Sequence, residues 1–331
     1  MAEHAHEVKL PTLSVVLPNY NHGEHLGRCL ASILSQSVAA LEVIVVDDGS
    51  TDNSVAIMEE LARQHPVIRF LRNEKNSGAV FSFNRGIDAA TGDYLVMVAA
   101  DDELRPGYFE KALRLLAQHP GAGICAGICE FRDMTSGLTW YLGTFLGDKE
   151  RFMTPDEMVT LGRQGKLVVA TGAMIVKREP FLAVGKYRKE LEWHCDWFAY
   201  FVVAFRHGMC FVPEVLAEFR LYPSSFSNKG MRQPERQREV LRRILELLEQ
   251  PEFHDAAERF RECGALSSFG RPMFKLLIGD RRFRKYLTPT YLRAVTWWSA
   301  KYAARKMLPD RVARFCLKVA GYSKLPRAGT P

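Results

Sequence analysis

The sequence predicts an α/β fold in which helices flank a mostly parallel central sheet and a helical region follows. Three observations support this prediction. Over the first 130 residues, short apolar runs rich in β-branched residues alternate with helical patterns, as in repeated βαβ units. Each run ends in polar or glycine-containing residues, as expected for the loops that follow parallel strands. From residue 231 onward the chain becomes charged and helical, so a second region is expected there.

The apolar runs predict four strands, at residues 13–17, 42–46, 67–71 and 94–98. Helices are expected between and after them, at residues 24–36, 53–64, 79–90 and 107–118. Thr51 and Asp52 are expected to cap the second helix, and Pro66 is expected to close it. Thr91-Gly92 is expected to end the third helix in a left-handed conformation.

The rest of the chain is less regular. A strand is expected at residues 123–128 and a helix at 196–206. Five apolar residues are spaced to form one helical stripe further on: Val240, Leu241, Ile244, Leu245 and Leu248. We therefore expect a tail at residues 1–12, a main domain at 13–230 and a basic helical region at 231–331.

The composition is that of an ordinary globular protein. The 331 residues are 47% hydrophobic and 25% charged, which is sufficient for a full core. No run approaches the roughly 18 consecutive apolar residues of a membrane-spanning helix, and the first ten residues lack the apolar centre of a signal peptide. A cytoplasmic protein is therefore expected. The seven cysteines show no paired zinc-site spacing, so free thiols are expected, with metal binding at Cys125 and Cys129 as the minor alternative.

The net charge of +7 is concentrated near the C-terminus. Residues 281–327 contain thirteen Lys and Arg against one acid, which gives +12 there and −5 elsewhere. Four apolar residues of this segment fall on one helical face: Tyr291, Val295, Trp298 and Tyr302. Two interpretations stay open: the segment lies on an anionic membrane surface, or it is a helix that packs its aromatic face on the protein. No nucleic-acid-reading motif accompanies the basic residues, so nucleic acid is not an expected partner.

Pairs of acids follow two of the predicted strands. Asp47 and Asp48 follow the second strand, and Asp101 and Asp102 follow the fourth. Ligands bind outside the carboxyl ends of parallel strands, so both pairs are expected on one rim of the sheet, where their repulsion favours a cation. Mg²⁺ and Mn²⁺ take one or two carboxylates and complete their shell with substrate phosphates and water. A turn followed by a helix cap is the alternative for either pair alone.

Six segments occur in a recognisable order: Ser14-Val-Val-Leu-Pro-Asn-Tyr-Asn21, Leu34-Ser-Gln-Ser37, Glu42-Val-Ile-Val-Val-Asp-Asp-Gly-Ser-Thr-Asp52, Asn76-Ser-Gly78, Asn84-Arg-Gly-Ile87 and Gly92-Asp-Tyr94. Together they resemble the family 2 glycosyltransferases, most closely in the first hundred residues and more sparsely up to about residue 228. The resemblance implies a GT-A type, Rossmann-like catalytic domain over residues 13–230. Its donor-binding half would span residues 13–105 and its acceptor-side half residues 106–230.

The resemblance also implies a nucleotide-sugar donor, with a UDP-sugar favoured. Asp48 would accept a hydrogen bond from the base, because an ionised carboxylate is an acceptor only and suits a ring N–H. The implied donor-binding residues are Pro18, Asn19, Tyr20, Asp47, Asp48, Asn76, Gly78, Asn84 and Asp101.

The family's metal motif usually reads Asp-x-Asp and aligns here with Ala99-Ala100-Asp101-Asp102. Ala99 replaces the first acid, which often contacts the ribose in the family. The resemblance implies that Asp101 and Asp102 bind Mn²⁺ or Mg²⁺ bridging the donor diphosphate.

The segment 190–198 resembles the part of the family that holds the general base, which implies this role for Asp196. Cys195 stands where the family has a companion acid, and an N-cap aspartate on the following helix is the structural alternative. Tyr222 stands where the family often has a His that binds the metal or a phosphate. Arg220 or Lys229 is therefore expected either to contact the diphosphate or to face water. His194, near Asp196, is expected as a wall or surface residue rather than a ligand.

These residues predict a metal-assisted transfer of a hexose-type sugar to an acceptor hydroxyl, with inversion because one base serves one face. By analogy, the expected setting is bacterial surface polysaccharide or glycolipid synthesis, with a saccharide or lipid-linked acceptor at the inner face of the cell membrane. The replacements at Ala99, Cys195 and Tyr222 keep open a catalytically weak nucleotide-sugar-binding or regulatory homologue. A nicotinamide-dependent dehydrogenase is disfavoured, because no GxGxxG follows the first strand.

Overall fold

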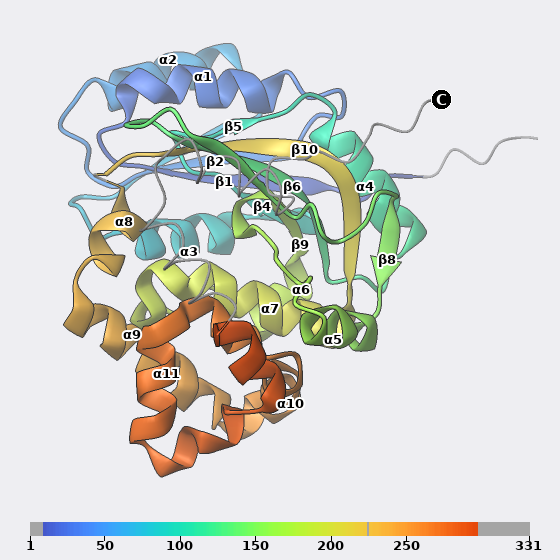
Figure 1. Ribbon diagram of the computed structural model, residues 1–331. Helices are drawn as coiled ribbons and strands as arrows, with labels where there is room; N and C mark the ends of the chain where they lie inside the picture. Colours follow the sequence, from blue (N-terminus) through green and yellow to red (C-terminus); the bar gives the residue numbers. More distant parts are fainter. Residues whose placement is uncertain (1–8, 224, 297–331) are drawn as a thin grey trace, which may run out of the picture.

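The computed structural model describes residues 9–223 and 225–296 of the chain (Figure 1). Within these residues, one sheet has the strand order β3-β2-β1-β4-β9-β6-β10-β5, with β7 beside β6 and β8 beside β10. Helices cover both faces of the sheet, and a group of C-terminal helices extends beyond one face (Figure 1). The predicted α/β architecture with a C-terminal helical region is therefore confirmed.

The N-terminal half is the parallel part of the sheet. Its strands are β1 (Leu13–Asn19), β2 (Glu42–Asp47), β3 (Ile68–Arg72) and β4 (Tyr94–Met97). The helices that connect them are α1 (Gly23–Leu34), α2 (Ser54–Gln64) and α3 (Ala79–Ala89). Every one of these elements was predicted, with ends that differ by one or two residues.

The predicted capping of α2 is wrong in detail. The N-cap position is Asn53, and its side chain makes no capping hydrogen bond. The Asp52 carboxylate accepts hydrogen bonds from the backbone N–H of Ser54 and of Gly23, both at 3.0 Å. Asp52 therefore joins the beginnings of two helices, α1 and α2.

The predicted left-handed stop at Gly92 is also wrong. Helix α3 ends earlier, and Gly92 does not adopt a positive φ. A Cβ atom on Gly92 would lie 2.8 Å from the backbone nitrogen of Ser14. Glycine is needed here for the close approach to β1 and not for a turn.

The second half of the sheet is mixed. Its strands are β5 (Glu103–Leu104), β6 (Ile124–Asp133), β7 (Thr139–Leu142), β8 (Arg151–Met153), β9 (Met174–Lys177) and β10 (Met209–Leu221). Its helices are α4 (Tyr108–Gln118), α5 (Pro155–Arg163), α6 (Arg178–Ala183), α7 (Cys195–His207) and α8 (Phe226–Met231). Strand β9 runs antiparallel to both β4 and β6, whereas β6 and β10 are parallel. The predicted strand at 123–128 forms the first part of β6, and the predicted helix at 196–206 is α7.

Two hydrophobic cores lie on opposite faces of the sheet. Helices α1, α2 and α4 close one core, and α3, α6 and α7 close the other. The second core continues into α9 (Pro234–Leu248), α10 (His254–Cys263) and α11 (Gly270–Gly279). The five stripe residues of α9 are all buried, as predicted. Phe205 of α7 meets Phe260 of α10 edge to face, with ring centroids 5.0 Å apart, so one core spans the predicted boundary near residue 230.

The end of the described chain is helical at residues 289–296. Tyr291 and Val295 are buried, which agrees with the packing interpretation for these two residues. Trp298, Tyr302 and most of the basic tail lie outside the described residues. Across the described chain, no helix has the length and apolarity needed to cross a membrane. The six cysteines in that part are buried, and no disulfide joins them.

Candidate active site

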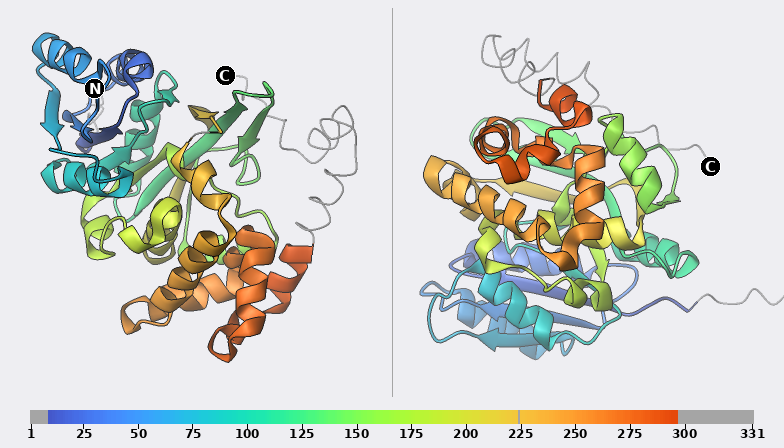
Figure 2. Two further views of the ribbon diagram at one scale, coloured as in Figure 1. Left: turned by 90° about the vertical axis from the view of Figure 1, so that its left-hand side faces the viewer. Right: turned by 90° about the horizontal axis from the view of Figure 1, so that it is seen from below.

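Most of the predicted site residues follow strands β1, β2 and β4, which end at one edge of the sheet. Parallel pairing of β1 with β2 and with β4 places the C-terminal ends of these strands side by side. Strand β9 is antiparallel to β4, with Ile175 opposite Val96. The short 3₁₀ helix η1 (Thr171–Ala173), directly before β9, therefore lies at the same edge. The left view of Figure 2 looks at this side of the molecule.

Asp48 is buried and fixes the loop that follows β3. Its carboxylate accepts hydrogen bonds from Asn73 Nδ2 at 2.7 Å and from the backbone N–H of Ser77 and Gly78 at 2.9 and 2.8 Å. Asn76 is exposed, and its Oδ1 also accepts from Gly78 N–H, at 3.1 Å. The carboxylate of Asp48 is thus oriented by three donors before any ligand binds.

Asp47 and Asn19 build the turn between β2 and α2. Asp47 is fully buried and accepts hydrogen bonds from Ser50 N–H at 3.0 Å and Asn19 Nδ2 at 3.3 Å. The Oδ1 atom of Asn19 is buried and has no hydrogen-bond partner among the described residues. Next to it, Pro18 is partly exposed and Tyr20 is 41% exposed. Tyr20 is therefore open to a ligand, whereas Asp47 is occupied by its own loop.

Asn84 ties α3 to a distant segment. Its Nδ2 donates to the carbonyl of Tyr187 at 2.8 Å, and its Oδ1 accepts from the N–H of the same residue at 3.2 Å. Both ends of the amide are engaged within the protein. A donor contact by Asn84 stays a prediction from the resemblance.

Asp101 and Asp102 follow β4 in a tight turn, in which Asp102 N–H donates to the carbonyl of Ala99 at 3.1 Å. Asp101 is partly exposed, and Asp102 is 6% exposed. Burial, and then the charge of Asp101, raise the pKa of Asp102 well above its usual range, while Arg220 lowers it. No group of three or more His, Cys, Asp or Glu in the described chain forms a metal site alone. Two adjacent carboxylates nevertheless fit a hard divalent cation whose shell is completed by phosphate oxygens and water.

Sequence reasoning missed a network of alternating charges beside Asp102. Its members are Glu103, Arg105, Glu130, Arg132, Glu218 and Arg220. Arg105 bridges Glu130 at 3.0 Å and Glu218 at 2.7 Å. Arg220 bridges Glu218 at 3.1 Å and Glu103 at 2.8 Å, while its Nη1 atom is buried and has no partner among the described residues. The tripeptide Glu-Phe-Arg, present at 130–132 and again at 218–220, is the sequence signal that would have revealed the network.

Asp196 is the second residue of α7, and the N-cap position belongs to His194. The N-cap alternative is therefore wrong. The Oδ2 atom of Asp196 accepts a hydrogen bond from Thr171 Oγ1 at 2.7 Å, and its Oδ1 atom accepts from Trp197 N–H at 2.6 Å. Burial raises the pKa of Asp196, and these hydrogen bonds oppose the rise. The bond to Thr171 places this carboxylate at the edge where β4 ends.

Cys195 and Tyr222, which stand where the family usually has other residues, have local structural roles, and so does His194. Cys195 is buried, and burial raises the pKa of its thiol well above the usual range, so the thiol stays neutral. The Tyr222 ring stacks on His25 of α1, with centroids 5.6 Å apart. His194 is buried, its Nε2 lies 3.0 Å from Gln237 Nε2, and burial lowers its pKa to about 4. This agrees with its interpretation as a wall residue. The Lys229 side chain lies outside the described part.

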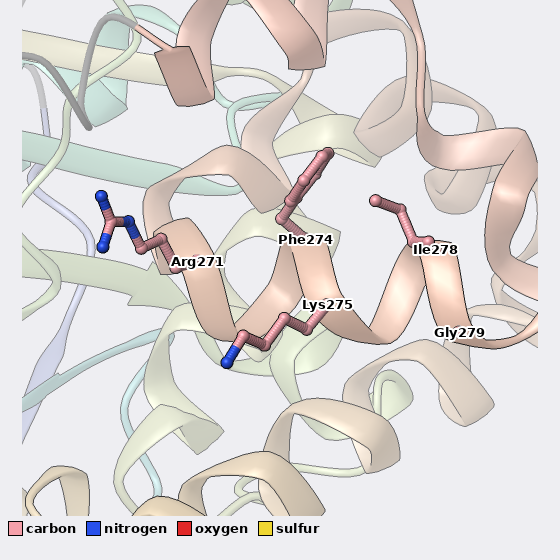
Figure 3. A pocket seen from close by; sticks show the side chains of 5 residues that line it. All are labelled: Arg271, Phe274, Lys275, Ile278 and Gly279. Carbon is pink, nitrogen blue, oxygen red and sulfur yellow. The ribbon is translucent and has the colours of Figure 1, made fainter.

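A surface cavity of about 390 Å³ lies elsewhere, on α11. Arg271, Phe274, Lys275, Ile278 and Gly279 line it, with Phe274 and Ile278 projecting to one side of the helix (Figure 3). None of the predicted site residues contributes to this cavity.

The fold and the acid-lined edge define a GT-A type α/β protein. A profile of the family described as Glycosyl transferase family 2 matches residues 14–184, more than half of the chain. The chain therefore belongs to the family 2 glycosyltransferases.

Curated relatives are similar over part of their length. The uncharacterized glycosyltransferase YibD of Escherichia coli K12 is 40% identical over 129 residues, which are 39% of this chain and 37% of YibD. A chondroitin synthase of Escherichia coli is 35% identical over 105 residues, which are 32% of this chain and 15% of the synthase. The chain thus spans well under two thirds of the length of these relatives.

A solved structure supports the fold over most of the chain. The structure of Staphylococcus aureus TarS 1–349 in complex with UDP-GlcNAc aligns with a TM-score of 0.60 at 19% identity. The alignment covers 86% of this chain and 79% of that one. The GT-A assignment therefore extends beyond the residues that the family profile matches.

Proposed function

We propose that this chain transfers a hexose-type sugar from a UDP-sugar to an acceptor hydroxyl, with inversion at the anomeric carbon. The observation that supports this most is the shared sheet edge: Asp48, the Asp101-Asp102 pair and Asp196 reach it from three separate segments. Family membership and the UDP-GlcNAc complex of TarS favour a nucleotide-sugar donor.

In the proposed reaction, Asp196 takes the proton of the acceptor hydroxyl. The acceptor oxygen then forms a bond to the anomeric carbon while the bond from that carbon to the diphosphate breaks. The nucleoside diphosphate leaves with the electron pair. Because the base and the leaving group lie on opposite sides of the anomeric carbon, the configuration inverts. Burial of Asp196 supports its role, since a raised pKa makes an ionised carboxylate a stronger base.

Asp101 and Asp102 are the residues that would hold Mn²⁺ or Mg²⁺. A bound cation would neutralise the charge that develops on the departing diphosphate. The buried Nη1 atom of Arg220, which has no partner among the described residues, lies close to this acidic turn and is a second positive group suited to phosphate oxygens.

We also propose that the enzyme works in polysaccharide or glycolipid synthesis, at an anionic membrane surface. The similarity to a chondroitin synthase supports a saccharide acceptor. Exposed Arg271 and Lys275 share α11 with Phe274 and Ile278, and Figure 3 shows the two apolar side chains on one side of the helix and Lys275 on the other. This combination of basic and apolar residues supports a peripheral membrane contact.

The proposal is tested by thermal melting of the purified chain with a panel of nucleotide sugars, with and without Mn²⁺, followed by assays of nucleotide release. One donor is expected to raise the melting temperature in the presence of Mn²⁺ and to be turned over. Asp196→Asn is expected to keep this stabilisation and to lower transfer about 10²- to 10⁴-fold. Stabilisation by a donor that the wild-type chain never turns over would favour the regulatory homologue instead.

A further inference from the structure

The segment that leads into α7 contains a backbone conformation that side chains rarely adopt. Glu192, in the 3₁₀ segment η2 (Lys189–His194), has φ 45° and ψ −114°. A positive φ is uncommon outside glycine, and a long side chain is an outlier there. Such conformations persist only where neighbouring groups hold them, and they cluster at functional sites. Asp196 follows four residues later, in the first turn of α7, so the contacts of η2 bear on its position.

Arg236 of α9 holds the side chain of Glu192. Its Nε atom lies 2.9 Å from one carboxylate oxygen of Glu192 and 3.1 Å from the other. The guanidinium carbon of Arg236 also lies 5.7 Å from the centroid of the Trp193 ring, within the range of a cation–π contact. One side chain of α9 thus contacts two consecutive residues of η2.

Gln237, the next residue of α9, contacts the end of η2. The indole N–H of Trp193 donates to Gln237 Oε1 at 2.7 Å, which fixes the orientation of the amide because an indole can only donate. Gln237 Nε2 then faces His194 Nε2 at 3.0 Å. Burial lowers the pKa of His194 to about 4, so the neutral ring accepts a hydrogen bond from the amide. All three side chains are buried, so loss of either bond leaves a polar group without a partner.

Other C-terminal elements contact the same stretch of chain. Arg188, directly before η2, bridges Glu252 of η3 (Pro251–Phe253) at 2.8 Å. The ring of His194 meets Phe269 of η4 (Ala265–Phe269) edge to face, with centroids 4.8 Å apart. The C-terminal helical region therefore holds the chain on the N-terminal side of Asp196 at several points.

We propose that Arg236 and Gln237 are positioning residues that keep Asp196 in its working place through residues 192–194. Relaxation of Glu192 would turn the start of α7 and draw the carboxylate of Asp196 away from Thr171. A catalytic group must stay within about 0.5 Å of its working position, and a misplacement of about 1 Å can lower the rate about 10²-fold. This inference rests on the proposed function, because it takes Asp196 as the base.

Cys195 provides a readout that needs no substrate, because it lies between η2 and Asp196 and is only 7% exposed. The full chain is treated with iodoacetamide under native conditions, and mass spectrometry measures the labelling rate of each cysteine. Gln237→Leu and Arg236→Ala are each expected to raise the rate at Cys195 about tenfold, because the lost bonds make local opening easier.

Arg243→Ala is the matched control for Arg236→Ala. Arg243 lies on the same helix and is similarly exposed, but it pairs with acids of α9 itself. It is expected to leave the labelling of Cys195 unchanged. The fully buried Cys125 and Cys210 are internal references, which are expected to keep their rates in every variant.

Release of UDP from UDP-GlcNAc and from UDP-glucose in the presence of Mn²⁺ provides the second readout. Gln237→Leu is expected to lower kcat about 10- to 100-fold and to leave KM for the donor within about twofold, because a displaced base slows the reaction without changing the donor contacts. Melting curves identify a misfolded Gln237→Leu variant. Trp193→Phe then replaces it, because this change removes the same hydrogen bond from the other side.

Three results would overturn the positioning role: Cys195 is labelled at the wild-type rate in both α9 variants, Arg243→Ala raises that rate equally, or faster labelling is accompanied by an unchanged kcat. Absence of UDP release by the wild type with both donors would instead count against the proposed function. The labelling rates would then still decide whether α9 holds the segment before Asp196.

Discussion

Thr171 Oγ1 donates a 2.7 Å hydrogen bond to the carboxylate of Asp196 across 25 residues of sequence. The hydroxyl comes from the turn that precedes β9, and the carboxylate from the first turn of α7. Burial favours the protonated form of Asp196, whereas the bond from Thr171 favours the ionised form. A residue outside its own helix therefore helps to keep the proposed base ionised.

Thr171→Val is expected to move the acidic limb of the transfer rate to higher pH. Loss of the hydroxyl removes an interaction with the ionised carboxylate, so the pKa of Asp196 rises further, and a base must be ionised to act. The measurement is kcat/KM against pH, with Thr171→Ser as the control that keeps the hydroxyl. Superimposed acidic limbs for the Val and Ser variants would remove Thr171 from this role.

The donor half could be predicted from the sequence because its signals are local. Strands β1 to β4 are short β-branched runs between amphipathic helices, and Asp48 and Asp101-Asp102 stand directly after such runs. Parallel pairing then fixes the edge at which they meet. The predicted helix ends at Asp52 and Gly92 failed because contacts with other segments, and not local turn preference, determine those backbones.

The acceptor half was less predictable because its determinants are pairings between distant segments. The contact of Thr171 with Asp196 and the stacking of Phe131 on Phe219 join residues far apart in the chain. The charge network likewise arises only when β5, β6 and β10 pair. The resemblance assigned Asn84 to donor binding. The side chain of Asn84 bonds the backbone of Tyr187, and this long-range contact could not be predicted from the residue type alone.

Asp102→Asn is expected to weaken Mn²⁺-dependent stabilisation of the chain by its donor, with at least about a tenfold loss of Mn²⁺ affinity. The raised pKa of Asp102 adds a pH dependence: because the cation must displace a proton, Mn²⁺ affinity should fall as the pH is lowered. Thermal melting at several Mn²⁺ concentrations and pH values measures both effects. Asp93→Asn, at the other end of β4, is the control, and an equal loss in both variants would contradict the assignment.

Charge reversal on α11 is expected to release the chain from anionic vesicles. Each basic residue near such a surface contributes about 1 kcal/mol to the free energy of binding. The double variant Arg271→Glu and Lys275→Glu should therefore lower the affinity for vesicles at least about tenfold. Flotation with phosphatidylserine vesicles at two salt concentrations measures this. Arg63→Glu with Arg114→Glu, at exposed positions on α2 and α4, reverses the same charge elsewhere. Equal flotation of both variants, or no flotation of the wild type, would argue against α11 as a membrane contact.

Gly49 and Gly78 provide a test of the loop that orients Asp48. Both have positive φ, +75° and +93°, and the ψ of 154° places Gly78 in a region that essentially only glycine adopts, so alanine at either position should lower folding stability by about 1–3 kcal/mol. At Gly49 the added Cβ atom would also lie 2.9 Å from the carbonyl carbon of Lys75, whereas nothing lies within 4 Å of it at Gly78. Such a close contact with the backbone typically lowers folding stability by a further amount of about 1–3 kcal/mol. Gly49→Ala should therefore melt well below Gly78→Ala and bind the nucleotide less tightly, because the Lys75–Gly78 segment must shift away from Asp48. Equal melting temperatures for the two variants would mean that this packing does not hold the loop in place.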